Sequence, residues 1–160
     1  MVSRVAGHYN MTTMLPSSGN DPSNGTYPLG RLNNPTGVVV DGAGAVYIVE
    51  SVTKVMHKLD GGVVTLLATS IAASPVGVTL DGVNNLLYIF DGSLSGGNRI
   101  TTFTTGGAVG PAVIGEAGVP GSTDGASPRF GDVQGGWYDA GASSLMVADG
   151  NATVRRVLVT

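Results

Sequence analysis

Three copies of one short pattern constrain the fold of this chain more than any other feature. The copies lie at residues 35–41 (PTGVVVD), 74–81 (SPVGVTLD) and, in a more degraded form, 134–139 (QGGWYD). Each copy is followed by an apolar run that ends in an acid, at residues 46–50 (VYIVE), 87–91 (LYIFD) and 145–149 (LMVAD). The repeating unit is therefore a pair of short apolar runs, each closed by an acidic residue.

The spacing of the copies predicts the architecture. Asp41 and Asp81 are 40 residues apart, whereas Asp81 and Asp139 are 58 apart, which indicates an insertion. Four short strands with their turns need about 40 residues, the length of one propeller blade. The composition of 26 glycines and 12% charged residues also favours many short strands joined by tight turns. We therefore expect an all-β chain of three β-propeller blades, each of four antiparallel strands, at roughly 1–60, 61–104 and 105–160.

The polarity of the strands indicates their place in a blade. Residues 38–40 and 46–49 are continuously apolar, as expected of inner strands covered on both faces. Charged residues interrupt the runs at 54–59 and 153–158, which is typical of a more solvated outer strand. A fourth strand is predicted at 63–68, and residues 2–7 have a similar pattern, so the chain opens on an outermost strand. Glycine-rich connections at 7–33 and 115–132 lead into inner strands, and we expect binding on the face that they build.

These residues resemble the NHL repeat, a six-bladed β-propeller family. The pattern is a Pro-x-Gly-apolar-x-apolar-Asp string, an apolar strand ending in an acid, and a third strand such as residues 98–103 (NRITTF). The connection at 115–125, followed by Arg129 and Phe130, is similar to an inter-repeat segment of the family. The resemblance implies the fold and leaves the activity open, because such propellers include interaction platforms, RNA binders and metal-dependent lyases or lactonases.

Three blades are too few to close a propeller ring, which typically has about four to eight blades. Each end of the chain would then expose an apolar blade face and an unpaired strand edge. We expect a homodimer that closes a six-bladed ring, in which residues 2–6 of one copy pair with residues 154–159 of the other. The chain is also interpretable as half of a longer natural propeller, and the two interpretations are compatible.

The composition argues against several classes of partner. A formal net charge of −3 gives no basic surface for a phosphate backbone, so we expect no nucleic acid partner. No apolar run approaches the roughly 18 residues of a membrane span, so we expect no membrane partner either. The chain has no cysteine and therefore no disulfide framework or thiolate nucleophile.

The acids fall into two columns of equivalent positions. Asp41, Asp81 and Asp139 follow the inner strands and precede turns, where an aspartate accepts backbone N–H hydrogen bonds. Glu50, Asp91 and Asp149 close the second strands, and this second column is either a set of turn caps or, with calcium as a possible cofactor, a cation site. Three basic residues on or beside the third strands are candidate partners of these acids in neighbouring blades: Arg99, Arg155 and Arg156.

Two functions remain open at this stage. Trp137 replaces Val39 and Thr79 in the third copy, and is either a buried side chain that fills space beside Gly135 and Gly136 or a residue on which a ligand stacks. We favour a non-catalytic module that binds a protein or other ligand, with Trp137 and Arg99 beside the second acid column as candidate binding residues. The alternative is a metal-dependent hydrolase or lyase whose central channel is lined by Glu50, Asp91 and Asp149. The two histidines are too few for a three-histidine zinc site, which argues against that alternative.

Overall fold

The first repeat folds into one antiparallel sheet with the strands in chain order. The computed structural model describes residues 25–26, 32–92, 96–150 and 152–159. The strands of the first sheet are β2 (Pro35–Val40), β3 (Val46–Glu50), β4 (Val55–Asp60) and β5 (Val63–Thr69), with the short β1 (Gly25–Thr26) paired to β5. The predicted apolar runs are therefore the inner strands, and the run with charged residues is the third strand.

The second and third repeats form two further antiparallel sheets. The second sheet contains β6 (Pro75–Asp81), β7 (Leu86–Asp91), β8 (Arg99–Thr104) and β9 (Val109–Gly115). The third sheet contains β10 (Val133–Asp139), β11 (Ser144–Asp149) and β12 (Thr153–Leu158). Among the described residues, no strand pairs with the outer edge of β12. The prediction of an all-β chain of antiparallel sheets is confirmed.

The sheets divide the chain at different places from the predicted blades at 1–60, 61–104 and 105–160. The strand at Val63–Thr69 pairs with β4 and belongs to the first sheet, and the strand at Val109–Gly115 pairs with β8 and belongs to the second. The reason is local, because a tight turn joins each third strand to the strand that follows it. The predicted strand at residues 2–7 lies outside the described residues.

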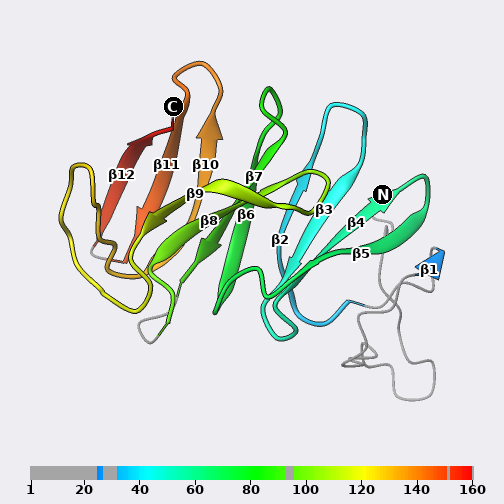
Figure 1. Ribbon diagram of the computed structural model, residues 1–160, viewed down its shortest axis with the longest axis horizontal. Helices are drawn as coiled ribbons and strands as arrows, with labels where there is room; N and C mark the ends of the chain where they lie inside the picture. Colours follow the sequence, from blue (N-terminus) through cyan, green and yellow to red (C-terminus); the bar gives the residue numbers. More distant parts are fainter. Residues whose placement is uncertain (1–24, 27–31, 93–95, 151, 160) are drawn as a thin grey trace.

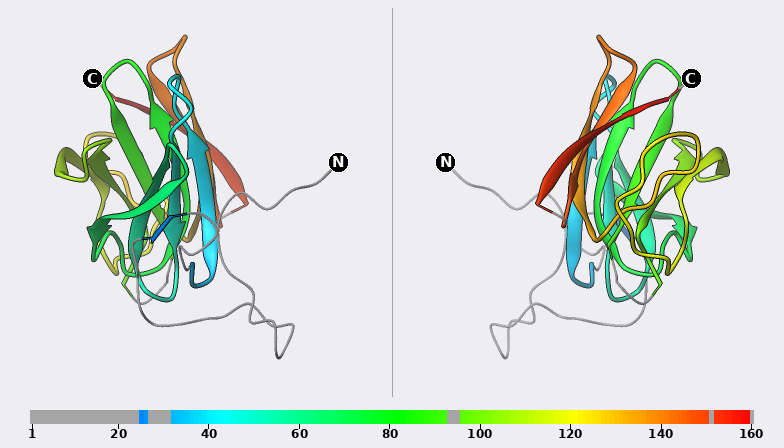
Figure 2. Two further views of the ribbon diagram at one scale, coloured as in Figure 1. Left: turned by 90° about the vertical axis from the view of Figure 1, so that its right-hand side faces the viewer. Right: turned by 90° about the vertical axis from the view of Figure 1, so that its left-hand side faces the viewer.

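The three sheets stand side by side in chain order, with the first at one end of the row and the third at the other (Figure 1). In the side views the sheets lie one behind another, which shows that they form a single row (Figure 2). Two hydrophobic cores fill the spaces between them. The first core contains Tyr47 and Met56 of the first sheet and Leu87 of the second, and the second core contains Phe90 of the second sheet and Leu145 of the third.

The glycine of the repeated Pro-x-Gly string allows the inner strands of neighbouring sheets to approach closely. A Cβ atom on Gly37 would lie 2.8 Å from both the Cα atom of Gly77 and the backbone nitrogen of Val78. The register shifts at the same place in each inner strand, between Pro35 and Gly37 in the first sheet and at the equivalent residues in the others. The repeat thus encodes a bulge and a glycine where the sheets converge.

The first acid column holds the turns between the first two strands of each sheet. The Oδ1 atom of Asp41 accepts hydrogen bonds from the backbone of Ala43 and Ala45, each 2.9 Å long. Asp81 and Asp139 accept equivalent backbone hydrogen bonds in the second and third sheets. Although burial acts to raise the pKa of Asp41, its hydrogen bonds outweigh this effect and lower the pKa below 3.8. The prediction that these aspartates hold turns is confirmed.

Within the described residues, no helix is long and apolar enough to span a membrane.

Candidate functional site

The second acid column lies at the end of the sheets where the long 116–132 connection enters β10. Glu50 is buried, and its Oε1 atom accepts a 2.9 Å hydrogen bond from the backbone N–H of Asn33, just before β2. Its Oε2 atom accepts a hydrogen bond from the Thr53 hydroxyl in the following turn. Glu50 therefore holds the start of the inner strand to the end of the second strand.

Asp91 and Asp149 repeat this arrangement in the other two sheets. The carboxylate of Asp91 accepts hydrogen bonds from the backbone of Ala73 at 3.0 Å and Ser74 at 2.7 Å. Asp149 accepts hydrogen bonds from the backbone of Gly131 at 2.7 Å and Asp132 at 3.1 Å. All three acids are buried and bind the segment that leads into the inner strand of their own sheet. They satisfy backbone N–H groups that would otherwise be buried without partners.

The arginines pair with these acids within one sheet, so the prediction of pairing between blades is wrong. The Nε atom of Arg99 lies 3.4 Å from Asp91 Oδ2, and Arg155 Nη1 lies 3.2 Å from Asp149 Oδ2. In both sheets the third strand returns beside the second strand, which brings the arginine to the acid of its own sheet. The first sheet has His57 in this role.

His57 forms a buried pair with Glu50. Its Nε2 atom lies 3.5 Å from Glu50 Oε1, and both side chains are inaccessible to solvent or nearly so. Neither ring nitrogen makes a hydrogen bond of good geometry among the described residues, although the backbone of Thr65 lies close enough to act on the pKa of the ring. Burial lowers the pKa of His57 below 6.5, and the neighbouring Glu50 carboxylate and the backbone of Thr65 oppose only part of this effect. The imidazole is therefore neutral at neutral pH, and the pair is structural rather than a free acid and base.

Arg155 fixes the 116–132 connection, a role that the sequence did not reveal. Besides Asp149, its guanidinium donates to the backbone carbonyls of Arg129 and Thr123 and to the carboxylate of Asp124. The guanidinium also lies 4.8 Å from the centre of the buried Phe130 ring. Arg155 and Arg156 are neighbours of the same type, so only the tertiary contacts distinguish the anchoring residue from the exposed one.

Trp137 is not buried, so the interpretation that it fills space beside Gly136 is wrong. Its side chain is 61% exposed on the outer face of the third sheet. The space above Gly136 is occupied by Phe90 of the second sheet, whose Cζ atom would lie 2.8 Å from a Cβ at that glycine. Trp137 is thus available to a ligand, a partner or another sheet.

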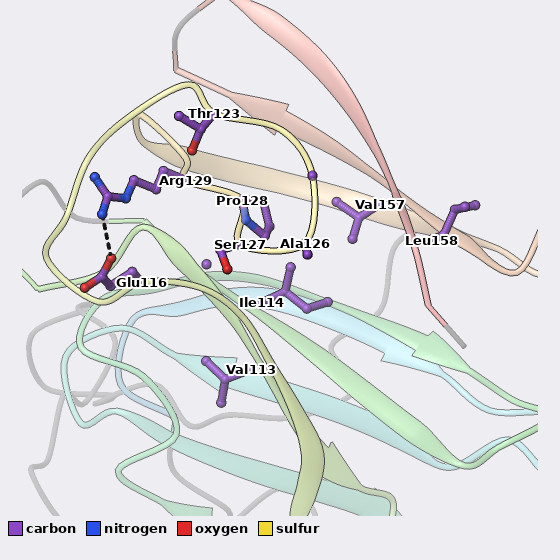
Figure 3. A pocket seen from close by; sticks show the side chains of 12 residues that line it. Val113, Ile114, Glu116, Thr123, Ala126, Ser127, Pro128, Arg129, Val157 and Leu158 are labelled. Carbon is purple, nitrogen blue, oxygen red and sulfur yellow. Dashed lines mark hydrogen bonds and ion pairs between the residues drawn. The ribbon is translucent and has the colours of Figure 1, made fainter.

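A cavity of about 800 Å³ lies between β9, β12 and the 116–132 connection (Figure 3). Val113 and Ile114 of β9 form one wall, and Val157 and Leu158 of β12 form the other. Its polar lining includes Glu116 and Arg129, which form an ion pair with an N–O distance of 3.2 Å. A second cavity of about 510 Å³ continues along β12 from Val154 to Leu158. The two cavities form a groove beside the unpaired edge of β12, and a groove of this kind suits an extended chain.

The sequence-predicted residues do not gather into one site. Each sheet has its own buried acid, hydrogen-bonded to the segment that enters the inner strand: Glu50, Asp91 and Asp149. Arg99 pairs with Asp91 in the second sheet, and Trp137 lies on a different face. Among the described residues, no group of three His, Asp or Glu side chains is arranged to hold a metal ion. The groove was not predicted, because it depends on where β9 and β12 separate.

Searches by sequence give no family, because no family model and no curated protein matches the chain. Solved structures do match it. A Bacteroides thetaiotaomicron protein of unknown function is 14% identical, with a TM-score of 0.61, and the match covers 88% of this chain and 32% of that one. A putative 6-phosphogluconolactonase from Bacteroides fragilis is 20% identical, with a TM-score of 0.58, over 95% of this chain and 43% of that one.

The WD40 β-propeller domain of Doa1 is also similar, at 14% identity and a TM-score of 0.56, with 85% of this chain and 40% of that chain covered. The chain therefore spans well under half the length of each of these structures. At these identities the likeness shows the fold alone. The three antiparallel sheets of this chain have the arrangement of part of a β-propeller.

Proposed function

We propose that the chain is a set of three NHL-like propeller blades that acts as a non-catalytic module and binds another protein at the end of the sheets bearing the 116–132 connection. The observation that supports this proposal best is the anchoring of the connection by Arg155. A long loop on a rigid scaffold is a common place for binding residues. Here the loop is held on one side by a guanidinium and on the other by the hydrogen bonds of Asp149 to Gly131 and Asp132.

The anchored connection presents a mixed set of charges to solvent. Glu116, Asp124 and Arg129 are exposed, while Phe130 at the end of the connection is buried. A loop that is fixed before binding loses less conformational entropy when a partner docks. Exposed charges of both signs on such a loop give specificity for a protein surface of complementary charge.

A binding experiment tests this proposal directly. A peptide library displayed on phage is selected on the wild-type chain, and the selected peptides are measured against a variant with Glu116, Asp124 and Arg129 all replaced by alanine. We expect the triple variant to bind at least tenfold more weakly. The matched control is Asp60→Ala in the β4–β5 turn at the opposite end of the first sheet, which should bind like the wild type. Failure to enrich peptides, or equal binding by the triple variant, contradicts the proposal.

The competing function is a metal-dependent hydrolase or lyase that uses Glu50, Asp91 and Asp149. The hydrogen bonds of these acids weigh against it, because a cation would have to replace backbone N–H groups that already occupy the carboxylate oxygens. Thermal melting with and without millimolar calcium separates the two functions. We expect an unchanged melting temperature, whereas a rise that saturates with calcium would support the metal-dependent function.

A further inference from the structure

Three large apolar side chains of the third sheet are exposed. Trp137, Val154 and Leu158 are 61%, 71% and 68% exposed, and the exposed Arg156 lies between the last two on β12. Trp137 occupies the position of Val39 in the first sheet and Thr79 in the second, which pack against or hydrogen-bond to the following sheet. The position of Trp137 therefore serves sheet-to-sheet contact in the first and second sheets, each of which is followed by another sheet.

The first sheet is incomplete on the opposite side. Val38 and Val40 of β2 are 63% and 55% exposed. The equivalent residues of the second sheet, Val78 and Leu80, pack against the first core. The row of sheets thus ends in two different apolar faces, one suited to a following sheet and the other to a preceding sheet. These faces lie at opposite ends of the row and cannot cover each other within one chain (Figure 1).

The third sheet also differs from the other two at its outer edge. The third strands β4 and β8 each pair with a fourth strand, β5 and β9 respectively. In the part of the chain that the structure describes, β12 has no such neighbour, and the groove lies where this neighbour would pair. Two residues of β9 in the second sheet, Val113 and Ile114, line the groove on the side opposite β12 (Figure 3).

The order of elements identifies a strand that fits there. In the second sheet the fourth strand, β9, is followed by a long connection and then by the inner strand β10 of the next sheet. The segment at residues 2–6 (VSRVA) is likewise followed by a long stretch of chain and then by the inner strand β2. In chain order, residues 2–6 therefore stand where the fourth strand of a preceding sheet would stand. Among the described residues, the third sheet has three strands and an unpaired edge at β12.

We propose that a second copy of this chain covers the third sheet, with its residues 2–6 pairing along β12 and its face of Val38 and Val40 packing against Trp137. The same contact is repeated in the other direction, so that two copies enclose six sheets in one ring. Six lies within the range of about four to eight blades at which propellers close. Each copy uses both of its apolar faces, which leaves neither exposed.

The mass of the chain in solution is the first test. Light scattering during gel filtration should give twice the 16.0 kDa of one chain. A mass of one chain would overturn the proposal, and so would a mass that keeps growing with concentration, because an open row of copies does not close. Trp137→Ser should halve the mass without changing the circular dichroism spectrum, because the side chain is largely exposed in the single chain. Val83→Ser is the control, since Val83 is also exposed, in the turn between β6 and β7, and its replacement should leave the dimer intact.

Cross-linking tests which segments meet. The chain has no cysteine, so single substitutions give unambiguous cross-links. Arg4→Cys and Arg156→Cys chains are mixed and treated with a short bismaleimide. We expect a cross-linked dimer in the mixture at several times the yield of either chain alone. Equal yields in all three samples would show that the copies associate through another surface and would overturn the proposed pairing.

Discussion

At the residue scale, the repeated acids and glycines satisfy backbone hydrogen bonds and allow close backbone packing, and these roles explain the repeat without a ligand. Its aspartates accept turn hydrogen bonds, its second-strand acids hold the segment entering the inner strand, and its glycines allow sheets to converge. The first of these roles was predictable from sequence, because an aspartate before a turn acts locally. The exposure of Trp137 was not predictable, because it depends on whether another sheet follows.

The convergence of the sheets predicts a large effect of a small substitution. Gly37→Ala would place a Cβ atom against the backbone of Gly77 and Val78, which cannot move aside like a side chain. We expect the free energy of unfolding to fall by about 1–3 kcal/mol, the usual cost of overpacking. Gly42→Ala is the matched control, because a Cβ atom on Gly42 would have no neighbouring atom within 4 Å. Urea denaturation measures both, and equal effects of the two changes would refute this account of the repeat glycine.

The buried His57–Glu50 pair predicts a loss of stability in mild acid. Burial lowers the pKa of His57 in the folded chain, so between that value and about 6.5 the unfolded chain binds more protons. The contribution of neutral His57 to the free energy of unfolding should therefore be fully present above about pH 6.5. It should be lost as the pH falls toward the pKa of His57 in the folded chain. Asp41 and Asp81, whose pKa values lie below 3.8, lose their contribution only at lower pH.

Urea denaturation at pH 7.5 and 5.5 measures this decline. His57→Gln should reduce the difference between the two pH values, whatever it does to stability at pH 7.5. His8→Gln removes the other histidine of the chain and serves as the control, which should keep the wild-type difference. An unchanged difference in the His57 variant would exclude the buried imidazole as its source.

At the scale of elements, the strands can be predicted from the sequence, whereas the conformation of the long 116–132 connection cannot. Alternation of apolar runs with Gly and Asp turns predicted the strands within a few residues, because each hairpin forms between neighbouring segments. The 116–132 connection has few apolar residues, and its conformation depends on Arg155, which lies 26 residues beyond Arg129. Contacts over such a distance leave no local pattern in the sequence.

Replacing that arginine tests whether it holds the connection. Arg155→Gln removes hydrogen bonds to two carbonyls and two carboxylates, and leaves the buried Asp149 without its charged partner. We expect a loss of about 1.5–3 kcal/mol in the free energy of unfolding. Hydrogen exchange of residues 121–131 should become faster. Arg156→Gln makes the same change at an exposed neighbour and should alter neither quantity.

At the scale of the whole molecule, both ends of the row of sheets present apolar surface. The two hydrophobic cores of the described residues show how such surface is buried in this fold, since each core lies between two neighbouring sheets. The burial of the end faces therefore depends on a further sheet. In the proposed dimer, this sheet comes from the second copy.

A dimer of this kind links stability to concentration. Because folding and association are coupled, the melting temperature of the wild-type chain should rise as its concentration is increased a hundredfold. The Trp137→Ser chain should melt at a temperature that does not depend on concentration. A wild-type melting temperature that stays constant over this range would contradict the coupling.

The sequence alone determined the all-β class, the repeat and the local hydrogen bonds of the turn aspartates. These features depend on periodicity and on residues a few positions apart, which are visible in a single chain. The tertiary structure decided the rest: the sheet boundaries, the pairing of arginines with acids within one sheet, the anchoring of the connection by Arg155 and the exposure of Trp137. These depend on which surfaces meet when the sheets stack, and packing between distant segments is set by the whole molecule.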